Sequence, residues 1–116
     1  MKKNNIAKSF TKKFVLNRKY QLLAEDFVTD ESHVELVFRD TYKDEIVFIP
    51  IRIVKKREYL AKEDIEAYLE DRKIIRTMKW FLTKHDLLSE EVRVDLAEVS
   101  IHGKKAALRY SMKVIY

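Results

Sequence analysis

Apolar residues recur with two different spacings along the chain, and each spacing predicts one kind of secondary structure. Ile6, Phe10 and Phe14 lie four residues apart in a stretch without Gly or Pro, which predicts an amphipathic helix over about residues 5–18. Three apolar stretches follow and predict strands, and the last is apolar almost throughout, as expected for a strand buried on both faces. These stretches are residues 20–23, 33–38 and 45–54.

Helical spacing returns in the second half of the chain. The stretch from Ala61 to about Lys84 predicts either one long helix or a kinked pair. Residues 92–101 and 106–116 are strand-like, and Gly103 between them can adopt the positive φ of a tight hairpin turn. The order helix, three strands, helix, two strands predicts a single α/β domain over residues 1–116 with a mixed central sheet.

The amino-acid composition excludes several kinds of functional site. The hydrophobic fraction of 47% predicts a folded chain, and the charged fraction of 37% predicts a densely ionic surface. A single glycine excludes glycine-rich phosphate loops, and the absence of cysteine excludes disulfides, thiolate zinc sites and cysteine nucleophiles. With no cysteine in the chain, the cytoplasm is the default location. No stretch approaches the roughly 20 apolar residues that cross a bilayer, so we expect no membrane partner.

The side chains that usually carry chemistry form no recognisable motif. His33, His85 and His102 lie far apart in sequence without a partner at metal-ligand spacing, and no G-x-S-x-G elbow is present. Trp80 and Tyr68 fall in or beside the helical stripe, which favours core or edge positions over a base-stacking platform.

Charge is strongly segregated along the chain, although the formal net charge is only +5. Residues 1–24 carry seven bases and no acid, whereas residues 25–50 carry eight acids and two bases. A second basic block spans Arg52 to Arg57. Such segments suit a polyanion through counterion release. The alternative is a solvated helix face that is balanced by the acidic strands next to it.

The spacing of apolar and polar residues over about residues 8 to 99 matches a known pattern, strongly in spacing and weakly in identity. The matching segments are Phe14-Val15, Lys19-Tyr20, Leu22-Leu23, Asp26-Phe27-Val28, Ser32 to Val37, Ile46 to Arg52, Ile74 to Leu82 and Arg93 to Leu96. This pattern resembles the YraN family of predicted endonucleases, which is related to archaeal Holliday junction resolvases and belongs to the PD-(D/E)XK nuclease superfamily. The resemblance implies a restriction-endonuclease-like core.

The same resemblance implies a catalytic site in which carboxylates and a lysine hold Mg²⁺ and activate water. The family's catalytic positions fall on Lys8, Glu35, Pro50 and Arg52, and only Glu35 is still a carboxylate. A lysine and a proline cannot bind Mg²⁺, and an arginine that stays protonated is a poor general base. We therefore expect no cofactor and no hydrolysis by the family mechanism.

The period of two in a strand places His33 and Glu35 on one face, and likewise Pro50 and Arg52. The family arrangement would bring these faces together, which predicts a structural ion pair between Glu35 and Arg52. The alternative is that the two side chains are solvated neighbours. Pro50 removes a backbone donor from an otherwise β-rich stretch, and this predicts a bulge or a sheet edge at that point.

The leading hypothesis is a catalytically inactive nuclease-fold protein that binds nucleic acid, with DNA as the expected partner. The predicted phosphate contacts are Lys8, Lys12, Lys13, Arg18, Lys19, Lys55, Lys56 and Arg57. One alternative is a protein-interaction domain or homodimer that pairs through the last strand, residues 108–116. Another is an endonuclease dependent on Mg²⁺ or Mn²⁺ with relocated ligands, for which the nearby acids are Asp30, Asp40, Asp44 and Glu45.

Overall fold

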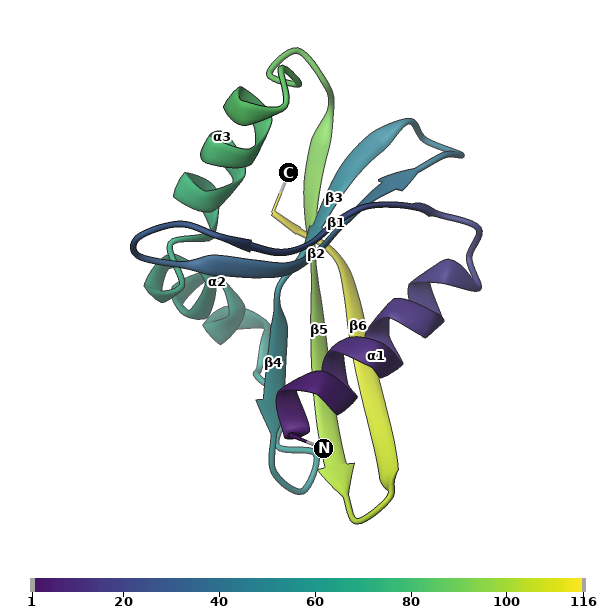
Figure 1. Ribbon diagram of the computed structural model, residues 1–116. Coiled ribbons are helices and arrows are strands. Elements are labelled where there is room, and N and C mark those ends of the chain that lie inside the picture. Colours follow the sequence, from purple (N-terminus) through teal and green to yellow (C-terminus); the bar gives the residue numbers. More distant parts are fainter. Residues whose placement is uncertain (1, 116) are drawn as a thin grey trace.

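The chain forms a mixed sheet with helices on both faces (Figure 1). The computed structural model describes residues 2–115. Its helices are α1 (Lys3–Leu16), α2 (Lys62–Asp71) and α3 (Ile74–Lys84). Its strands are β1 (Gln21–Val28), β2 (His33–Asp40), β3 (Glu45–Ile49), β4 (Ile51–Val54), β5 (Val92–His102) and β6 (Lys105–Ile115). The predicted α/β class with a mixed central sheet is confirmed.

Strand β5 organises the sheet. Strands β1, β2 and β3 form an antiparallel meander. β3 and then β4 run along one edge of β5, both parallel to it, while β6 pairs with the opposite edge of β5 in the antiparallel sense. The predicted third strand, residues 45–54, therefore corresponds to β3 and β4 placed end to end.

Pro50 lies between β3 and β4, and the pairing with β5 continues across it. Phe48 pairs with Val94 and Ile51 with Ala97, so both strands advance by three residues and the expected bulge is absent there. β2 pairs with β3 but with no part of β4 in the described chain, residues 2–115. Pro50 thus marks the point where the strand separates from β2, and the prediction of a sheet edge is confirmed.

Two apolar cores fill the space between the sheet and the helices. The core under α1 includes Val15, Phe38, Val47, Ile49 and Val99, all fully buried. The core under α2 and α3 includes Phe48, Leu69, Met78, Phe81 and Leu96. Helices cover both faces of the sheet, so the central part of β3 is buried on both sides, which explains its continuous apolar sequence from Ile46 to Ile49.

The buried face of α1 differs from the predicted stripe. Ala7, Thr11 and Val15 are fully buried, whereas Phe10 is 39% exposed and Phe14 lies at the margin. Small side chains at the first two positions let the helix approach the sheet closely, and the Thr11 hydroxyl donates a hydrogen bond to the Ala7 carbonyl. The helical period was predicted correctly, but the buried face is centred one residue later than expected.

The helical stretch after β4 is a pair of helices, and the expected hairpin closes the chain. α2 and α3 are separated at Arg72 and Lys73, where Lys73 adopts a left-handed conformation with φ 55°. Gly103 has φ 60° in the β5–β6 turn, as predicted. None of the helices in residues 2–115 is long and apolar enough to cross a membrane.

A buried arginine ties together three acids beneath α1. Arg93 is 1% exposed and donates hydrogen bonds to Asp40 (2.7 Å), Glu45 (2.9 Å), Asp95 (3.1 Å) and the Tyr20 hydroxyl (3.0 Å). Burial lowers the pKa of Arg93, but these partners outweigh that effect and raise it above its ordinary value. The network therefore holds strands β2, β3 and β5 together as a fully charged unit.

Candidate functional site

Three of the four family-equivalent catalytic positions line one polar pocket of about 640 Å³. Lys8 reaches it from α1, Glu35 from β2 and Arg52 from β4, and Arg72 closes it from the end of α2. Pro50, between β3 and β4, is buried and does not line this pocket. We refer to this pocket as the polar cleft. The sequence thus placed Lys8, Glu35 and Arg52 together correctly, but it did not include Arg72.

Arg72 occupies the gap where β2 and β4 separate. Its Nη2 lies 3.0 Å from Glu35 Oε1 and 2.7 Å from the His33 carbonyl, and its Nη1 donates to the Ile51 carbonyl at 3.2 Å. The Ile51 amide also donates to Glu35 Oε1, at 3.0 Å. Burial lowers the pKa of Arg72, but the charge of Glu35 outweighs it and raises that pKa. A permanent cation therefore bridges two strands that have no backbone pairing here.

The predicted ion pair between Glu35 and Arg52 is wrong. Arg52 Nη1 lies 3.0 Å from Oε2 of Glu98, a fully buried carboxylate that also accepts a hydrogen bond from Arg109. Arg52 and Glu98 are direct register partners on β4 and β5, so their side chains are close neighbours. Glu35 instead pairs with Arg72. The residue that neutralises Arg52 belongs to β5, which the resemblance did not connect with this position.

The polar cleft does not suit Mg²⁺, the ion that the family resemblance implies. Both oxygens of Glu35 have partners, because Oε1 accepts from Arg72 and Ile51 and Oε2 lies 3.5 Å from His33 Nε2. Three cationic side chains line the same space. Mg²⁺ needs several free oxygen ligands in octahedral order. Within residues 2–115, no three His, Asp or Glu side chains form a group that could hold a metal ion.

The acids proposed as relocated ligands lie elsewhere. Asp40 and Glu45 are bound to Arg93 under α1. Asp44 pairs with Arg39 at 2.9 Å in the β2–β3 turn. Asp30 lies in the β1–β2 turn, beside α3. None of these four acids lines the polar cleft.

Two of the predicted phosphate contacts on α1 are already neutralised. Lys8 forms a hydrogen bond with Asp26, and Lys12 Nζ lies 3.1 Å from Glu25 Oε1, both on β1. The hydrogen bond to Asp26 raises the pKa of Lys8. For these two lysines, the alternative of a basic helix face balanced by the neighbouring acidic strand describes the structure.

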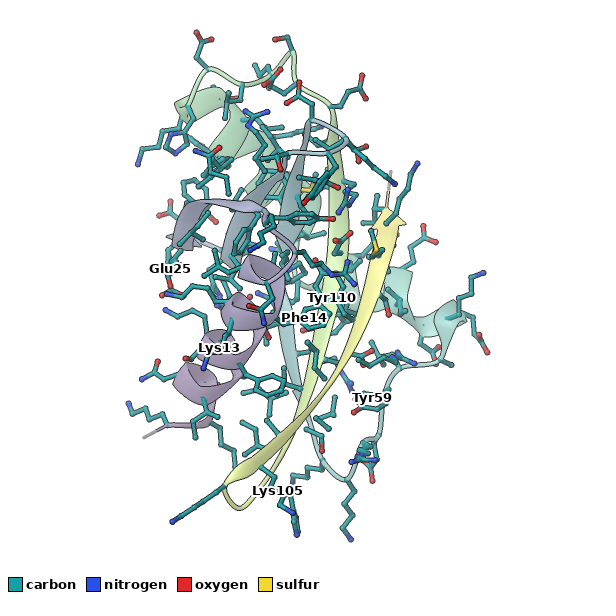
Figure 2. All side chains as sticks on the ribbon, turned by 90° about the vertical axis from the view of Figure 1, so that its right-hand side faces the viewer. Lys13, Phe14, Glu25, Tyr59, Lys105 and Tyr110 are labelled. Atoms are coloured by element: carbon teal, nitrogen blue, oxygen red, sulfur yellow. The ribbon has the colours of Figure 1, made fainter. Side chains whose placement is uncertain are left out.

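The other bases of the first segment differ among themselves. The Arg18 guanidinium lies over the rings of Phe14 and Tyr110, 4.9 Å and 5.2 Å from their centroids, so it covers apolar surface. Figure 2 shows Phe14 and Tyr110 side by side where α1 meets β6, and Lys13 on the outer side of α1. Within residues 2–115, Lys13 and Lys19 have no acidic partner within ion-pair distance.

A group of free cations gathers at one end of the sheet. The turn after β4 carries Lys55, Lys56 and Arg57, and the Arg57 amide donates to Ser100 Oγ on β5 at 3.1 Å. This contact brings the turn beside the β5–β6 hairpin, whose turn carries Lys104 and Lys105 (Figures 1 and 2). All five are exposed, and none has an acidic partner among the described residues. We call these five residues the basic tip.

The sequence predicted three of the five residues of the basic tip, Lys55, Lys56 and Arg57, as phosphate contacts. It did not predict Lys104 and Lys105, which follow Gly103 between the last two strands. The parallel pairing of β4 with β5, in register from Ile51 to Val54, is what brings the two turns together. The N-terminus of α1, with Lys2 and Lys3, lies towards the same end of the molecule (Figure 1).

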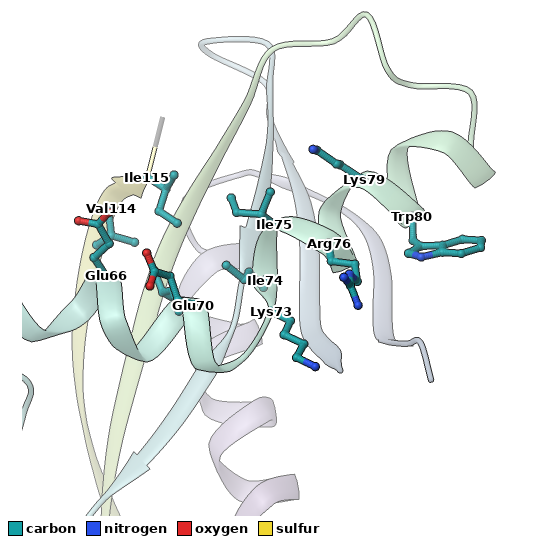
Figure 3. A pocket seen from close by; sticks show the side chains of 11 residues that line it. Glu66, Glu70, Lys73, Ile74, Ile75, Arg76, Lys79, Trp80, Val114 and Ile115 are labelled. Atoms are coloured by element: carbon teal, nitrogen blue, oxygen red, sulfur yellow. The ribbon is translucent and has the colours of Figure 1, made fainter. Parts of the chain in front are cut away.

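A largely apolar pocket of about 780 Å³ lies between α2, α3 and the end of β6 (Figure 3). Ile75, Val114 and Ile115 form its apolar walls, and it contains none of the residues that the sequence singled out for phosphate or metal contacts. Trp80 stands at one end of it and is 60% exposed, so Trp80 is not a core residue. Tyr68 is half-buried and lines the polar cleft.

No protein-family model matches the chain, and no curated protein shows sequence similarity to it. A functional assignment therefore depends on the geometry of the polar cleft and on the distribution of surface charge.

Proposed function

We propose that this protein binds nucleic acid, with DNA as the expected ligand, on a nuclease-like fold that no longer cleaves phosphodiesters. The observation that carries the proposal is the basic tip, where five exposed cations from two turns lack acidic partners among the described residues. The like charges of such a cluster repel one another, whereas phosphates would neutralise them and release condensed counterions. Binding of this kind is salt-sensitive and independent of base sequence.

The nuclease-like part of the proposal is supported by the element order and by the position of the polar cleft. The order helix, strands, helix, strand is the one that the resemblance to the YraN family implies. Lys8, Glu35 and Arg52 share a cleft, as the catalytic positions of a restriction-endonuclease-like core would. The charge of this cleft argues against hydrolysis, because Arg72 already neutralises Glu35.

Pairing of β6 with a second copy of the chain is less well supported. β6 carries Lys105, Arg109 and Lys113 and no acid, so self-pairing would bring like charges together. Lys113 has φ 51° within an irregular part of the β5–β6 register, which distorts the edge that a partner strand would need. Charged side chains and irregularities of this kind usually protect an edge strand from pairing.

The test is fluorescence anisotropy with a labelled four-way junction, a duplex and a single strand, each across a salt series without divalent metal. In the double variant Lys55→Ala/Lys56→Ala, two phosphate contacts are lost. Each contact contributes about 0.9 to the slope of log K against log salt for duplex DNA, so the slope should flatten by about 1.8.

The matched control is Lys19→Ala/Lys43→Ala, which removes the same charge at the other end of the molecule. Lys19 and Lys43 belong to neighbouring turns, since the Lys19 carbonyl accepts a hydrogen bond from Thr41. We expect the control to keep the slope of the unmodified protein, which would remove Lys19 from the predicted phosphate contacts and leave the basic tip as the binding surface. Equal losses in the two double variants, or no binding at low salt, would reject the basic tip as the binding surface.

A further inference from the structure

The outer face of α3 presents one large aromatic side chain between two cations. Arg76, Trp80 and Lys84 are four residues apart, so they form a single stripe along the helix. Trp80 is 60% exposed and projects from α3 away from Ile75 and Val114 (Figure 3). A tryptophan on a polar helix face buries little surface in the monomer, and the fold does not require it there.

Trp80 also forms one wall of a separate pocket of about 550 Å³. The facing wall comes from the β1–β2 hairpin, where Phe27 and the 67% exposed Val28 present apolar surface. Arg76 and Lys84 lie at the rim of the same pocket. A flat ring beside an apolar wall suits a planar apolar group, and the cations at the rim suit an anion attached to that group.

Some of the cations around this pocket have acidic partners among the described residues and others have none. Arg76 pairs with Glu31, and so does Lys73, at 3.2 Å. Lys84 lies 5.9 Å from the centroid of the Phe27 ring, and neither it nor Lys79 has an acidic partner among residues 2–115. α3 contains no acid at all. The surface next to Trp80 therefore has free positive charge.

We propose that this pocket takes an unpaired base of a single-stranded nucleic acid, which stacks on Trp80 while its phosphates lie near Lys84. The proposal rests on the nucleic-acid binding proposed above and adds which nucleic acid is preferred, one with unpaired bases. Aromatic side chains bind single strands in this way because every base has a π face. An anionic membrane fits less well, since the site is a pocket and not a flat or protruding surface.

Trp80 is the only tryptophan in the chain, so its fluorescence reports directly on this pocket. We expect a single-stranded oligonucleotide to quench it, because a stacked base contacts the indole ring. An oligonucleotide of the same length with abasic sites and a blunt duplex should bind without quenching. Polyglutamate serves as the probe for a purely acidic partner and should not quench either.

Variants separate stacking from charge. Trp80→Ala should weaken single-strand binding roughly tenfold, within the range known for loss of one stacked base, and leave duplex binding unchanged. Trp80→Phe keeps a ring and should retain most of the affinity. The control is Tyr42→Ala, which removes an aromatic ring that is 74% exposed in the β2–β3 turn and should change neither. If Trp80→Ala does not fold, Lys84→Ala should weaken single-strand binding alone.

The outcomes distinguish the two proposals. Duplex binding without quenching by any single strand overturns the pocket but leaves the basic tip intact. Equal quenching by abasic strands or by polyglutamate overturns base stacking and indicates a site for general polyanions. Absence of binding to every nucleic acid overturns both proposals together.

Discussion

The Arg72 bridge can be tested by replacing its guanidinium with an apolar side chain of similar length, in Arg72→Met. The substitution removes the hydrogen bonds to the Ile51 and His33 carbonyls together with the ion pair to Glu35. Glu35 would keep the Ile51 amide and the more distant His33 as partners. β2 and β4 would then separate without a connection, and a carboxylate would remain in a cleft without its main counter-charge.

The expected loss of stability in Arg72→Met depends on how deeply the ion pair between Arg72 and Glu35 is buried. Removing one member of a fully buried ion pair costs about 3–5 kcal/mol. Arg72 and Glu35 are each 16% exposed, so solvent recovers part of that cost and we expect about 2–3 kcal/mol. Unfolding entropies of roughly 2 cal/mol/K per residue convert this loss to a fall in melting temperature of about 10 °C for a chain of this length.

Thermal and urea unfolding, followed by circular dichroism, would measure the change. The matched control is Arg76→Met, since Arg76 also pairs with a glutamate but the two side chains are 60% and 45% exposed. The control should lose less than about 1 kcal/mol. A double-mutant cycle with Glu35→Gln should give a coupling above about 1 kcal/mol for the Arg72 pair. Equal losses in Arg72→Met and Arg76→Met would refute the bridge.

Three further outcomes are expected. Burial raises the pKa of Asp40, but hydrogen bonds from Arg93 and from backbone amides have the larger effect, so the pKa is lowered overall. Ionised Asp40 therefore stabilises the fold at neutral pH, and this stability is lost as the pH falls below about 4. Asp40→Asn should therefore lower the melting temperature at pH 7 and flatten its decline in acid; an unchanged acid profile would contradict this. Millimolar Mg²⁺ should not raise the melting temperature, because the polar cleft offers no free carboxylate, and a metal-dependent rise would count against that conclusion. Gly103→Ala should lower the free energy of unfolding by about 1 kcal/mol, because alanine is strained at a φ of 60°. An added Cβ meets no atom within 4 Å, so no steric clash contributes to this loss. Unchanged stability in denaturant unfolding would contradict the prediction.

Local sequence patterns were sufficient for most of the fold. The apolar stretches predicted every strand, although β1 extends to Val28, beyond the predicted residues 20–23, because its second half is polar and largely exposed. Gly103 correctly identified the last turn. The buried face of α1 was misplaced because Phe10 and Phe14 dominate any hydrophobic pattern. Close packing against the sheet instead selected the small residues Ala7 and Thr11, and a period alone does not reveal which neighbouring face the sheet will accept.

The residues of the polar cleft could be predicted only in part from the spacing of apolar and polar residues along the chain. The resemblance brought Lys8, Glu35 and Arg52 together from segments far apart in sequence, and they share one pocket. It did not predict Arg72, which enters from the end of α2, 37 residues after Glu35. A kinked pair of helices was one of the two predictions for this stretch, but no Gly or Pro marks where the break lies, so the position of Arg72 at the end of α2 could not be predicted. Which acid pairs with which base depends on tertiary contacts, and a local sequence pattern does not predict these.

The two interpretations of the basic N-terminal segment turn out to apply to different residues. Lys8 and Lys12 are balanced by Asp26 and Glu25, so α1 and β1 neutralise each other where they meet. The basic tip has no such partner within the described chain, and the acids on β2 and β3 are already bound, Glu35 to Arg72 and both Asp40 and Glu45 to Arg93. A nucleic acid would therefore gain most by contacting the end of the sheet and not the polar cleft. If so, the footprint of this protein differs from that of a nuclease, which must bring the phosphate into the cleft, and charge changes at Lys8 would leave affinity nearly unaltered.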